Sequence, residues 1–263
     1  MSISFLAGAV KQKHSYFAAD FSTEVSSIKT EVRQSVEKSE ETLLDFGRRI
    51  FAAISENSVA VKLNFFDFIM LPKGMNVLAE AIHSAKSCGL YVILGAEGIK
   101  GELLPILFGE KTPSYTFEPD ALEICPYCAD KNKICELAKA YSRDIFITLN
   151  TDAGYSPAVY AEHIKKFASP ERTGFLISES NSEELCDLRE NLHEYMFAAS
   201  GKDIDEEIKN CFNPDGSGAI VLMPVSRFIR SAEHFEREAA LGTMKSAAAI
   251  NRRLFKKSRI LKL

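Results

Sequence analysis

Residues 59–94 read VAVKLNFFDFIMLPKGMNVLAEAIHSAKSCGLYVIL, and they contain one complete strand–helix–strand pattern. The runs 59–63 and 90–94 are apolar on both faces, which is typical of strands that are covered by helices. Between them, Val77, Leu78, Ala81, Ile82 and Ala85 form one apolar stripe of a helix over 75–88, which stops at Gly89. The stretch therefore predicts a βαβ unit with parallel strands.

The same alternation continues along the chain and predicts a parallel sheet. The predicted strands are Ser15–Asp20, Val59–Leu63, Leu90–Leu94, Ala121–Ile124, Asp144–Leu149, Thr173–Ser178, Glu194–Ala199 and Gly218–Leu222. A helix is expected from Ser182, one long or two shorter helices over 22–56, and a final solvated helix over the basic tail 252–262, for which an anionic partner is the alternative. Such a count of elements fits either a closed barrel or an open doubly wound sheet.

Composition limits the class of function. A chain of 263 residues with 46% hydrophobic and 26% charged residues fits a single domain over 1–263. The net charge of −4 offers no broad positive field for phosphate backbones, so nucleic acid is not expected as a partner. No apolar run of about 18 residues is present, which argues against a membrane span or secretion and predicts a cytoplasmic protein with a small-molecule ligand.

Several blocks, in order, resemble bacterial orotidine 5′-phosphate decarboxylases. Residues 59–66 (VAVKLNFF) resemble their second strand, 15–20 (SYFAAD) the first, and 120–127 (DALEICPY) the family's D-A-L-T-V-N-P-Y. Residues 174–188 and 218–232 are similar to strand six with its helix and to strand eight. The resemblance implies a (β/α)8 TIM barrel with its site at the carboxyl ends of the strands, a homodimer, a family role in UMP synthesis, and no cofactor.

The reactive centre of that family departs from its pattern in this chain. Strand three of the family ends in D-A-K-R-G-D, and its lysine stabilises and protonates the carbanion left by decarboxylation. This chain reads GAEGIK at 95–100, so Gly95, Glu97 and Lys100 stand at the aligned positions. We therefore expect a decarboxylation centre that is lost or altered. The alternative is an active decarboxylase or lyase that uses Lys62, Glu97 and Lys100, with Lys100 turned inward. Lys62 can also simply reach solvent or pair with Asp20.

The groups that the family uses to anchor its ligand are partly retained, which predicts a phosphorylated small molecule or nucleotide as ligand. Phosphate-binding candidates follow strands seven and eight: Ser200, Gly201, Lys202 and Arg227. Candidate substrate contacts lie at the ends of strands one, two and five: Asp20, Asn64, Asn150 and Thr151. Loop capping can also explain Asn150 and Thr151, and a surface salt bridge can explain Arg227.

Three cysteines suggest a rival function. Cys125 and Cys128 form a C-P-Y-C motif and Cys135 follows, a grouping that favours a thiol redox site or, with one further ligand, a metal site. The motif follows the fourth predicted strand, whereas a thioredoxin-type protein carries it after the first. The five histidines have no ligand spacing, so no other metal site is predicted.

Overall fold

The chain folds into a closed barrel of parallel strands in the order β1 to β8, as seen in a computed structural model. The structure describes residues 2–21, 40–71, 73–125, 131–150, 159, 162, 165, 168–178, 182–200, 207–231 and 233–255. The strands are β1 (Phe17–Phe21), β2 (Ala60–Asn64), β3 (Tyr91–Gly95), β4 (Ala121–Ile124), β5 (Asp144–Asn150), β6 (Thr173–Ser178), β7 (Met196–Ser200) and β8 (Ala219–Pro224). β1 pairs with β8, with Phe17 opposite Val221, and this pairing closes the sheet and excludes the open alternative.

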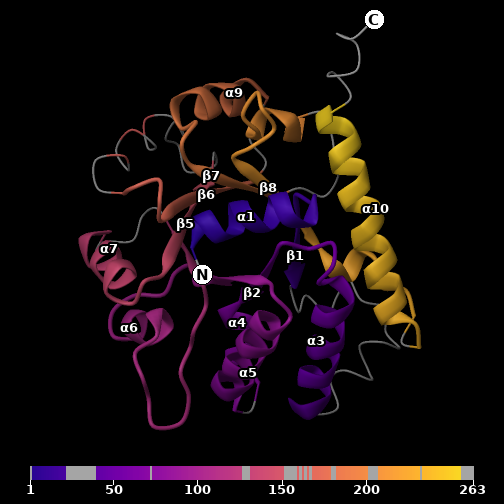
Figure 1. Cartoon of the computed structure of the whole chain (residues 1–263). Helices are drawn as coiled ribbons and strands as arrows, with labels where there is room; N and C mark the ends of the chain where they lie inside the picture. Colours follow the sequence, from indigo (N-terminus) through magenta and orange to yellow (C-terminus); the bar gives the residue numbers. More distant parts are fainter. Residues whose placement is uncertain are drawn as a thin grey trace, which may run out of the picture.

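Helices surround the barrel, which Figure 1 shows nearly end-on, and the first helix lies across its near end. They are α1 (Ile3–Lys13), α3 (Glu40–Ile54), α4 (Phe65–Ile69), α5 (Gly74–Ser87), α6 (Leu103–Phe108), α7 (Lys131–Ala140), α9 (Ser182–Asn191) and α10 (Phe235–Phe255), with the 3-10 turns η2 (Glu207–Cys211) and η3 (Val225–Arg227). The helices expected over 75–88 and from Ser182 are confirmed as α5 and α9. Of the segment 22–56, residues 22–39 lie outside the described part of the chain, as does the tail from 256 onward.

Two apolar cores follow from the two faces of the sheet. Side chains that alternate along each strand point outward to the ring of helices or inward to the barrel axis. The outer core joins residues such as Phe17, Val61 and Leu94 to the helices, and the inner core contains Ala18 and Ala60. The alternation therefore separates a helix-facing layer from a barrel interior.

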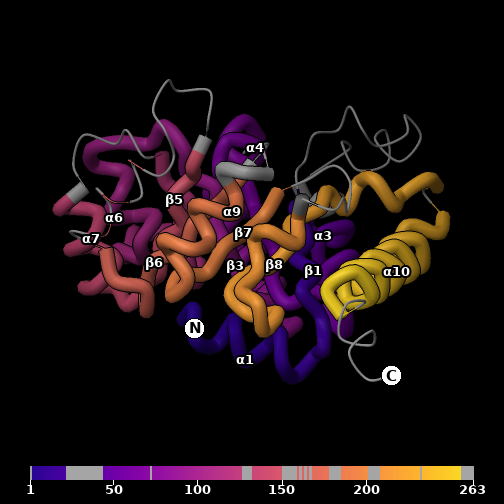
Figure 2. The backbone as a smooth tube through the Cα atoms, turned by 90° about the horizontal axis from the view of Figure 1, so that it is seen from above, coloured from indigo at the N-terminus to yellow at the C-terminus, as the bar shows by residue number. Residues whose placement is uncertain are grey.

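Helix α1 closes one end of the barrel. Ile3, Leu6 and Ala9 are buried against the inner core, which includes Tyr91 at the first position of β3. This contact places α1 over the amino ends of the strands, at the bottom of the view in Figure 2, whereas α4 lies at the opposite end. The free end, formed by the carboxyl ends of the strands, is called the mouth of the barrel below.

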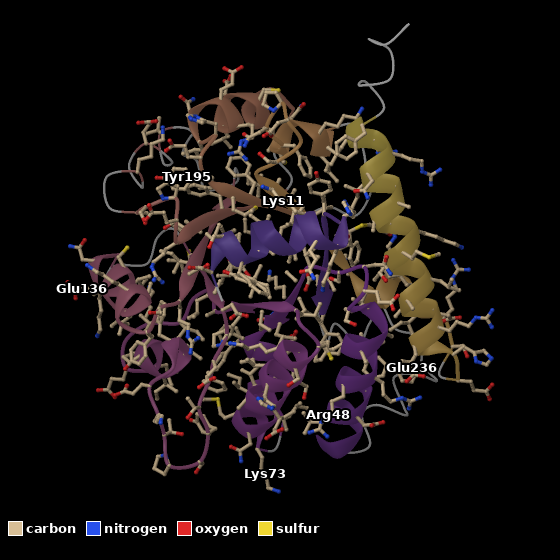
Figure 3. All side chains as sticks on the ribbon, in the orientation of Figure 1. Lys11, Arg48, Lys73, Glu136, Tyr195 and Glu236 are labelled. Atoms are coloured by element: carbon tan, nitrogen blue, oxygen red, sulfur yellow. The ribbon has the colours of Figure 1, made fainter. Side chains whose placement is uncertain are left out.

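The outer layer is held together by polar contacts as well as by apolar packing. Arg49 on α3 donates to Glu236 on α10 over 2.6 Å and lies 4.6 Å above the ring of Phe235. Figure 3 shows Glu236 and Arg48 on these adjacent helices. Among the described helices, none is both long enough and apolar enough to cross a membrane.

Candidate functional site

The barrel brings residues from neighbouring strands together at the mouth, four of them polar and one a glycine. Each of them stands two residues after a member of the inner core, and therefore shares its inward direction. Lys62 follows Ala60 on β2, Glu123 follows Ala121 on β4, and Gly95 follows Ile93 on β3. The same rule sends Asp20 on β1 and Thr148 on β5 inward, after Ala18 and Phe146.

The central feature of this site is a buried ion pair between β2 and β4. The ammonium nitrogen Nζ of Lys62 lies 2.7 Å from Oε2 of Glu123, and the two side chains are 19% and 4% exposed. The hydroxyl of Thr148 donates to the other oxygen, Oε1, of Glu123 over 3.0 Å. Both carboxylate oxygens thus have a partner, as a buried charge requires.

The charges at the mouth keep Lys62 protonated. Burial is the largest influence and lowers the pKa of Lys62, but the charges of Glu123, Asp20 and Glu97, with the hydrogen bond to Glu123, raise it further than burial lowers it. The net result is a pKa above the ordinary lysine value, so the side chain is an ammonium at neutral pH. One cation therefore faces three carboxylates in this cluster.

Gly95 makes room for the carboxylate of Glu123. A Cβ atom at Gly95 would lie 3.1 Å from Oε2 of Glu123 and 3.4 Å from both Cε of Lys62 and the carbonyl oxygen of Leu63. Strand three thus brings no carboxylate to this place, and the carboxylate that lies beside Gly95 comes from strand four.

Glu123 and Thr148 were not among the predicted site residues. The signal for Glu123 was present: a carboxylate interrupts the apolar strand 121–124, at the place where the similar family motif has threonine. Lys62 forms an ion pair with Glu123, and the charge of Asp20 also raises the pKa of Lys62, so the expected pairing of Lys62 with Asp20 stays a prediction beside it.

Glu97 and Lys100 lie in the loop after β3. Both side chains are exposed, and Gly98 and Gly101 have φ angles of 80° and 72°, which shape this loop into turns. The charge of Glu97 reaches Lys62, whereas Lys100 is not among the charges that shift the pKa of Lys62. The inward position that the lyase alternative requires of Lys100 is therefore not the one in this structure.

The phosphate-binding candidates follow two adjacent strands. Ser200 is the last residue of β7 and is half-buried, and Arg227 ends η3, directly after β8, with an exposed side chain. β7 and β8 pair in parallel, with Ser200 opposite Leu222, so both residues lie at the mouth on the same side of the barrel. Gly201 and Lys202 lie outside the described residues.

Of the substrate-contact candidates on and after β2 and β5, the structure describes the side chain of Asn64 only. Asn64 caps α4, because its Oδ1 accepts a hydrogen bond from the backbone N–H of Phe66 over 3.3 Å. Asn150 is the last residue of β5, and the structure describes only its backbone. Thr151 lies outside the described residues.

The cysteines do not form a cluster in the described part of the chain. Cys125 and Cys135 are free, half-buried and packed against the outer core, and Cys128 lies outside the described residues. Burial raises the pKa of Cys135, which is the opposite of what a reactive thiolate needs. No group of three or more metal-ligating side chains occurs among the described residues.

Comparison with solved structures identifies proteins of the same architecture. An orotidine monophosphate decarboxylase from Leishmania donovani matches 97% of this chain and 100% of its own, with 17% identity and a TM-score of 0.72. The orotidine 5′-monophosphate decarboxylase of Plasmodium berghei matches 93% of this chain and 99% of its own, with 13% identity and a TM-score of 0.65. This chain has the fold of the orotidine 5′-phosphate decarboxylases.

The likeness to these decarboxylases extends over almost the whole barrel, as the order of the sequence blocks predicts. A UMP synthase from Leishmania donovani matches 96% of this chain over 56% of its own length, with 16% identity and a TM-score of 0.73. The sequence matches no protein-family model and no curated protein. The decarboxylase fold is therefore recognised through the structure, at identities too low to transfer an activity.

Proposed function

We propose that this barrel binds a phosphorylated small molecule, such as a nucleotide, at its mouth, and that it does not decarboxylate orotidine 5′-phosphate. The observation that carries the proposal is the asymmetry of the mouth. Arg227 and Ser200 follow β8 and β7 on one side, while on the other side the ammonium of Lys62 is paired with Glu123.

The side of β7 and β8 suits a phosphate group. Exposed arginine offers a planar fork of N–H donors that can bind two phosphate oxygens at once. Arg227 has this exposed position immediately after β8, the usual phosphate corner of a (β/α)8 barrel. The solved neighbours with this fold include proteins named for orotidine 5′-monophosphate, which is itself a phosphate ester.

The side of β2 to β4 is unsuited to the decarboxylation of an anionic substrate. Loss of carbon dioxide leaves a carbanion, which needs positive charge beside it. The positive charge of Lys62 is already balanced at 2.7 Å by Glu123, and Asp20 and Glu97 add further negative charge. Unit charges of like sign about 4 Å apart repel by about 4 kcal/mol at an effective dielectric constant of about 20, so this cluster opposes a second anion.

The binding proposal is tested by thermal unfolding with a panel of nucleotides and sugar phosphates. A ligand at about 100 times its dissociation constant should stabilise the fold by about 2.7 kcal/mol. We expect at least one member of the panel to raise the Tm of the wild type, and Arg227→Ala to abolish that shift.

Arg253→Ala is the matched control, because it removes an exposed arginine from the last turn of α10. It should leave the shift unchanged. A shift that survives in Arg227→Ala would show that the phosphate corner is assigned wrongly, and a panel with no shift at all would refute the proposed function.

A lyase is the second candidate, and the Lys62–Glu123 contact favours it, because an ammonium and a carboxylate in hydrogen-bond contact can exchange a proton. Its direct test is the consumption of orotidine 5′-phosphate by purified protein, with Lys62→Ala as the comparison. We expect no turnover by the wild type. Turnover that disappears in Lys62→Ala would replace the binding proposal by a decarboxylase.

We also propose that the chain forms a homodimer and works as one domain over residues 1–263 in the cytoplasm. Exposed apolar side chains on helices that follow β2 and β3 support the dimer. Met70, Phe66 and Leu103 are 83%, 46% and 42% exposed.

The redox or metal function of Cys125, Cys128 and Cys135 stays a prediction, which the raised pKa of Cys135 does not favour.

A further inference from the structure

Among the described residues of the mouth, Glu123 carries the most buried charge. Its side chain is 4% exposed, and each of its oxygens is engaged, one with the Lys62 ammonium at 2.7 Å and the other with the Thr148 hydroxyl at 3.0 Å. Contacts from β2 and β5 thus fix a carboxylate of β4 on the barrel axis. A carboxylate held from two sides keeps its position when a ligand arrives.

This position of the carboxylate depends on a glycine on the adjacent strand. Gly95 on β3 is opposite Glu123 on β4 in the register of the sheet. Its missing side chain leaves the space in which Oε2 of Glu123 lies, 3.1 Å from where a Cβ atom would be. A larger residue at 95 would therefore crowd the carboxylate of Glu123 and require it to shift by a few tenths of an ångström.

We propose that Glu123 determines which phosphorylated ligands this mouth accepts: those whose buried end carries neutral hydroxyl groups, and not those whose buried end carries a carboxylate. The inference rests on the proposed binding of a phosphorylated molecule, and it specifies the chemistry of the end that lies opposite the phosphate.

The reason is the hydrogen-bonding capacity that remains at the ion pair. An ammonium has three N–H donors, so Lys62 can serve a ligand hydroxyl while it keeps its bond to Glu123. A hydroxyl can also donate to a carboxylate such as Asp20 or Glu123. A neutral hydroxyl thus finds both a donor and acceptors among the charged groups of the mouth.

A ligand carboxylate meets the opposite situation. It accepts hydrogen bonds but has no proton to donate, and it would compete with Glu123 for the single ammonium of the cluster. Asp20, Glu97 and Glu123 would repel it together, because all three act on the same lysine. Selectivity then comes mainly from repulsion of the wrong ligand.

The test uses pairs of ligands that differ by a carboxylate at the end opposite the phosphate. Glucose 6-phosphate, which carries a hydroxyl at that end, is compared with 6-phosphogluconate. Uridine 5′-phosphate and orotidine 5′-phosphate, whose rings carry no hydroxyl, form a second pair that tests the repulsion of the carboxylate alone. Dissociation constants are measured by calorimetry for the wild type, Glu123→Gln and Glu136→Gln. Glu136 is the matched control, an exposed glutamate on the outer helix α7 (Figure 3). In the wild type, the member without the carboxylate should bind at least tenfold more tightly.

In Glu123→Gln this preference should shrink at least tenfold or reverse, because the ammonium of Lys62 loses its counter-charge. Glu136→Gln should behave as the wild type. Equal or tighter wild-type binding of the carboxylated members, or an unchanged ratio in Glu123→Gln, would overturn the role of Glu123 while leaving phosphate binding intact. If none of the four ligands binds, the proposed function falls, and this inference with it.

A second variant keeps the inference testable if Glu123→Gln does not fold. Gly95→Asp combined with Glu123→Thr returns a carboxylate to the same space from β3 and removes the one from β4. We expect this double variant to fold and to restore the wild-type preference, whereas Glu123→Thr alone should lack it. A double variant that folds but has no preference would contradict the inference.

Discussion

Asp144 and Glu123 are both carboxylates buried inside the barrel, but their partners differ. Glu123 is paired with a lysine, whereas Asp144, at the amino end of β5, accepts a hydrogen bond of 2.7 Å from the hydroxyl of Tyr91. Burial raises the pKa of Asp144 to about 6, although the hydrogen bond from Tyr91 and the charge of Arg172 both act to lower it. The hydroxyl of Tyr91 thus does not fully compensate the burial of this carboxylate.

This raised pKa predicts how stability depends on pH. The folded state binds the proton of Asp144 more tightly than the unfolded state does, so the free energy of unfolding should fall as the pH rises from about 4 to about 6. Asp144→Asn keeps an acceptor for Tyr91 and should remove this dependence. One pKa unit corresponds to about 1.4 kcal/mol. Above pH 7, the free energy of unfolding of Asp144→Asn should therefore exceed that of the wild type by up to about 3 kcal/mol.

Urea unfolding of both proteins at pH 4, 5, 6 and 7.5 measures the effect. The difference between variant and wild type isolates Asp144 from other groups that titrate in this range. A difference that stays constant across the four pH values would contradict the raised pKa.

Arg189 is a buried cation that is held by backbone carbonyl oxygens. Its guanidinium donates to the carbonyl oxygens of Cys211 and Gly218 at 3.0 Å, of Tyr195 at 2.9 Å, and of Leu192, and lies 3.8 Å above the ring of Phe197. Burial lowers its pKa to about 10, which still leaves it charged at neutral pH. These bonds join α9, η2 and the start of β8, and so fix the strands that lead to Ser200 and Arg227.

At the scale of elements, α1 is a plug: it covers the end of the barrel formed by the amino ends of the strands. Its first turn is capped by the hydroxyl of Ser2, which accepts from the N–H of Phe5 over 3.4 Å. At its other end, the ammonium of Lys13 donates to the carbonyl oxygens of Ser55 and Ser58 at 2.7 and 2.9 Å. These contacts tie the helix to the segment before β2 and keep its apolar face on the barrel interior.

The plug makes a prediction about stability. Leu6 is fully buried among the inner-core residues, and replacement of a buried leucine by alanine typically costs about 2–5 kcal/mol. Leu6→Ala should therefore lower the free energy of unfolding by that amount in a denaturant titration. Lys11→Ala, an exposed position on the same helix (Figure 3), should change it by less than about 0.5 kcal/mol. Equal effects of the two variants would mean that α1 does not seal the barrel.

At the scale of the whole molecule, the mouth combines elements from all around the barrel. The ion pair comes from β2 and β4, its supporting hydroxyl from β5, and the phosphate candidates from β7 and β8. Closure of the sheet brings these strands to one end, and α1 occupies the other. The proposed ligand therefore lies across the barrel axis, with its phosphate and its neutral end on different sides.

The proposed dimer also belongs to this scale. Met70, directly after α4, is the most exposed large apolar side chain among the residues that the structure describes at the mouth end. If this surface forms the dimer, Met70→Lys should shift the protein toward monomer in analytical ultracentrifugation, because a buried unpaired charge weakens an interface. Leu241→Lys, on α10, should not. Dissociation by Leu241→Lys alone would move the interface to α10, and a wild-type monomer would refute the dimer.

The course of the strands could be read from the sequence with little error. The predictions for β4 and β6 are confirmed at the same residues, and the other strands are displaced by one or two residues at their ends. A strand buried on both faces needs a continuous apolar run, and this requirement is local in sequence. The resemblance in block order also pointed to the right architecture, which the solved structures with this fold support.

The sequence by itself determined where strands and helices form, since periodicity and apolar content act over a few adjacent residues. It also placed Lys62 at the end of a strand and showed that Gly95 brings no carboxylate to the next one. The partner of Lys62 was decided by tertiary structure alone. Glu123 is distant in sequence, and the pairing of β3 with both β2 and β4 brings it to the space left open by Gly95, where its carboxylate lies 2.7 Å from the ammonium. Contacts between strands depend on the register of their pairing and on the space that a small residue such as Gly95 leaves on a neighbouring strand. Neither can be deduced from one short stretch of the sequence.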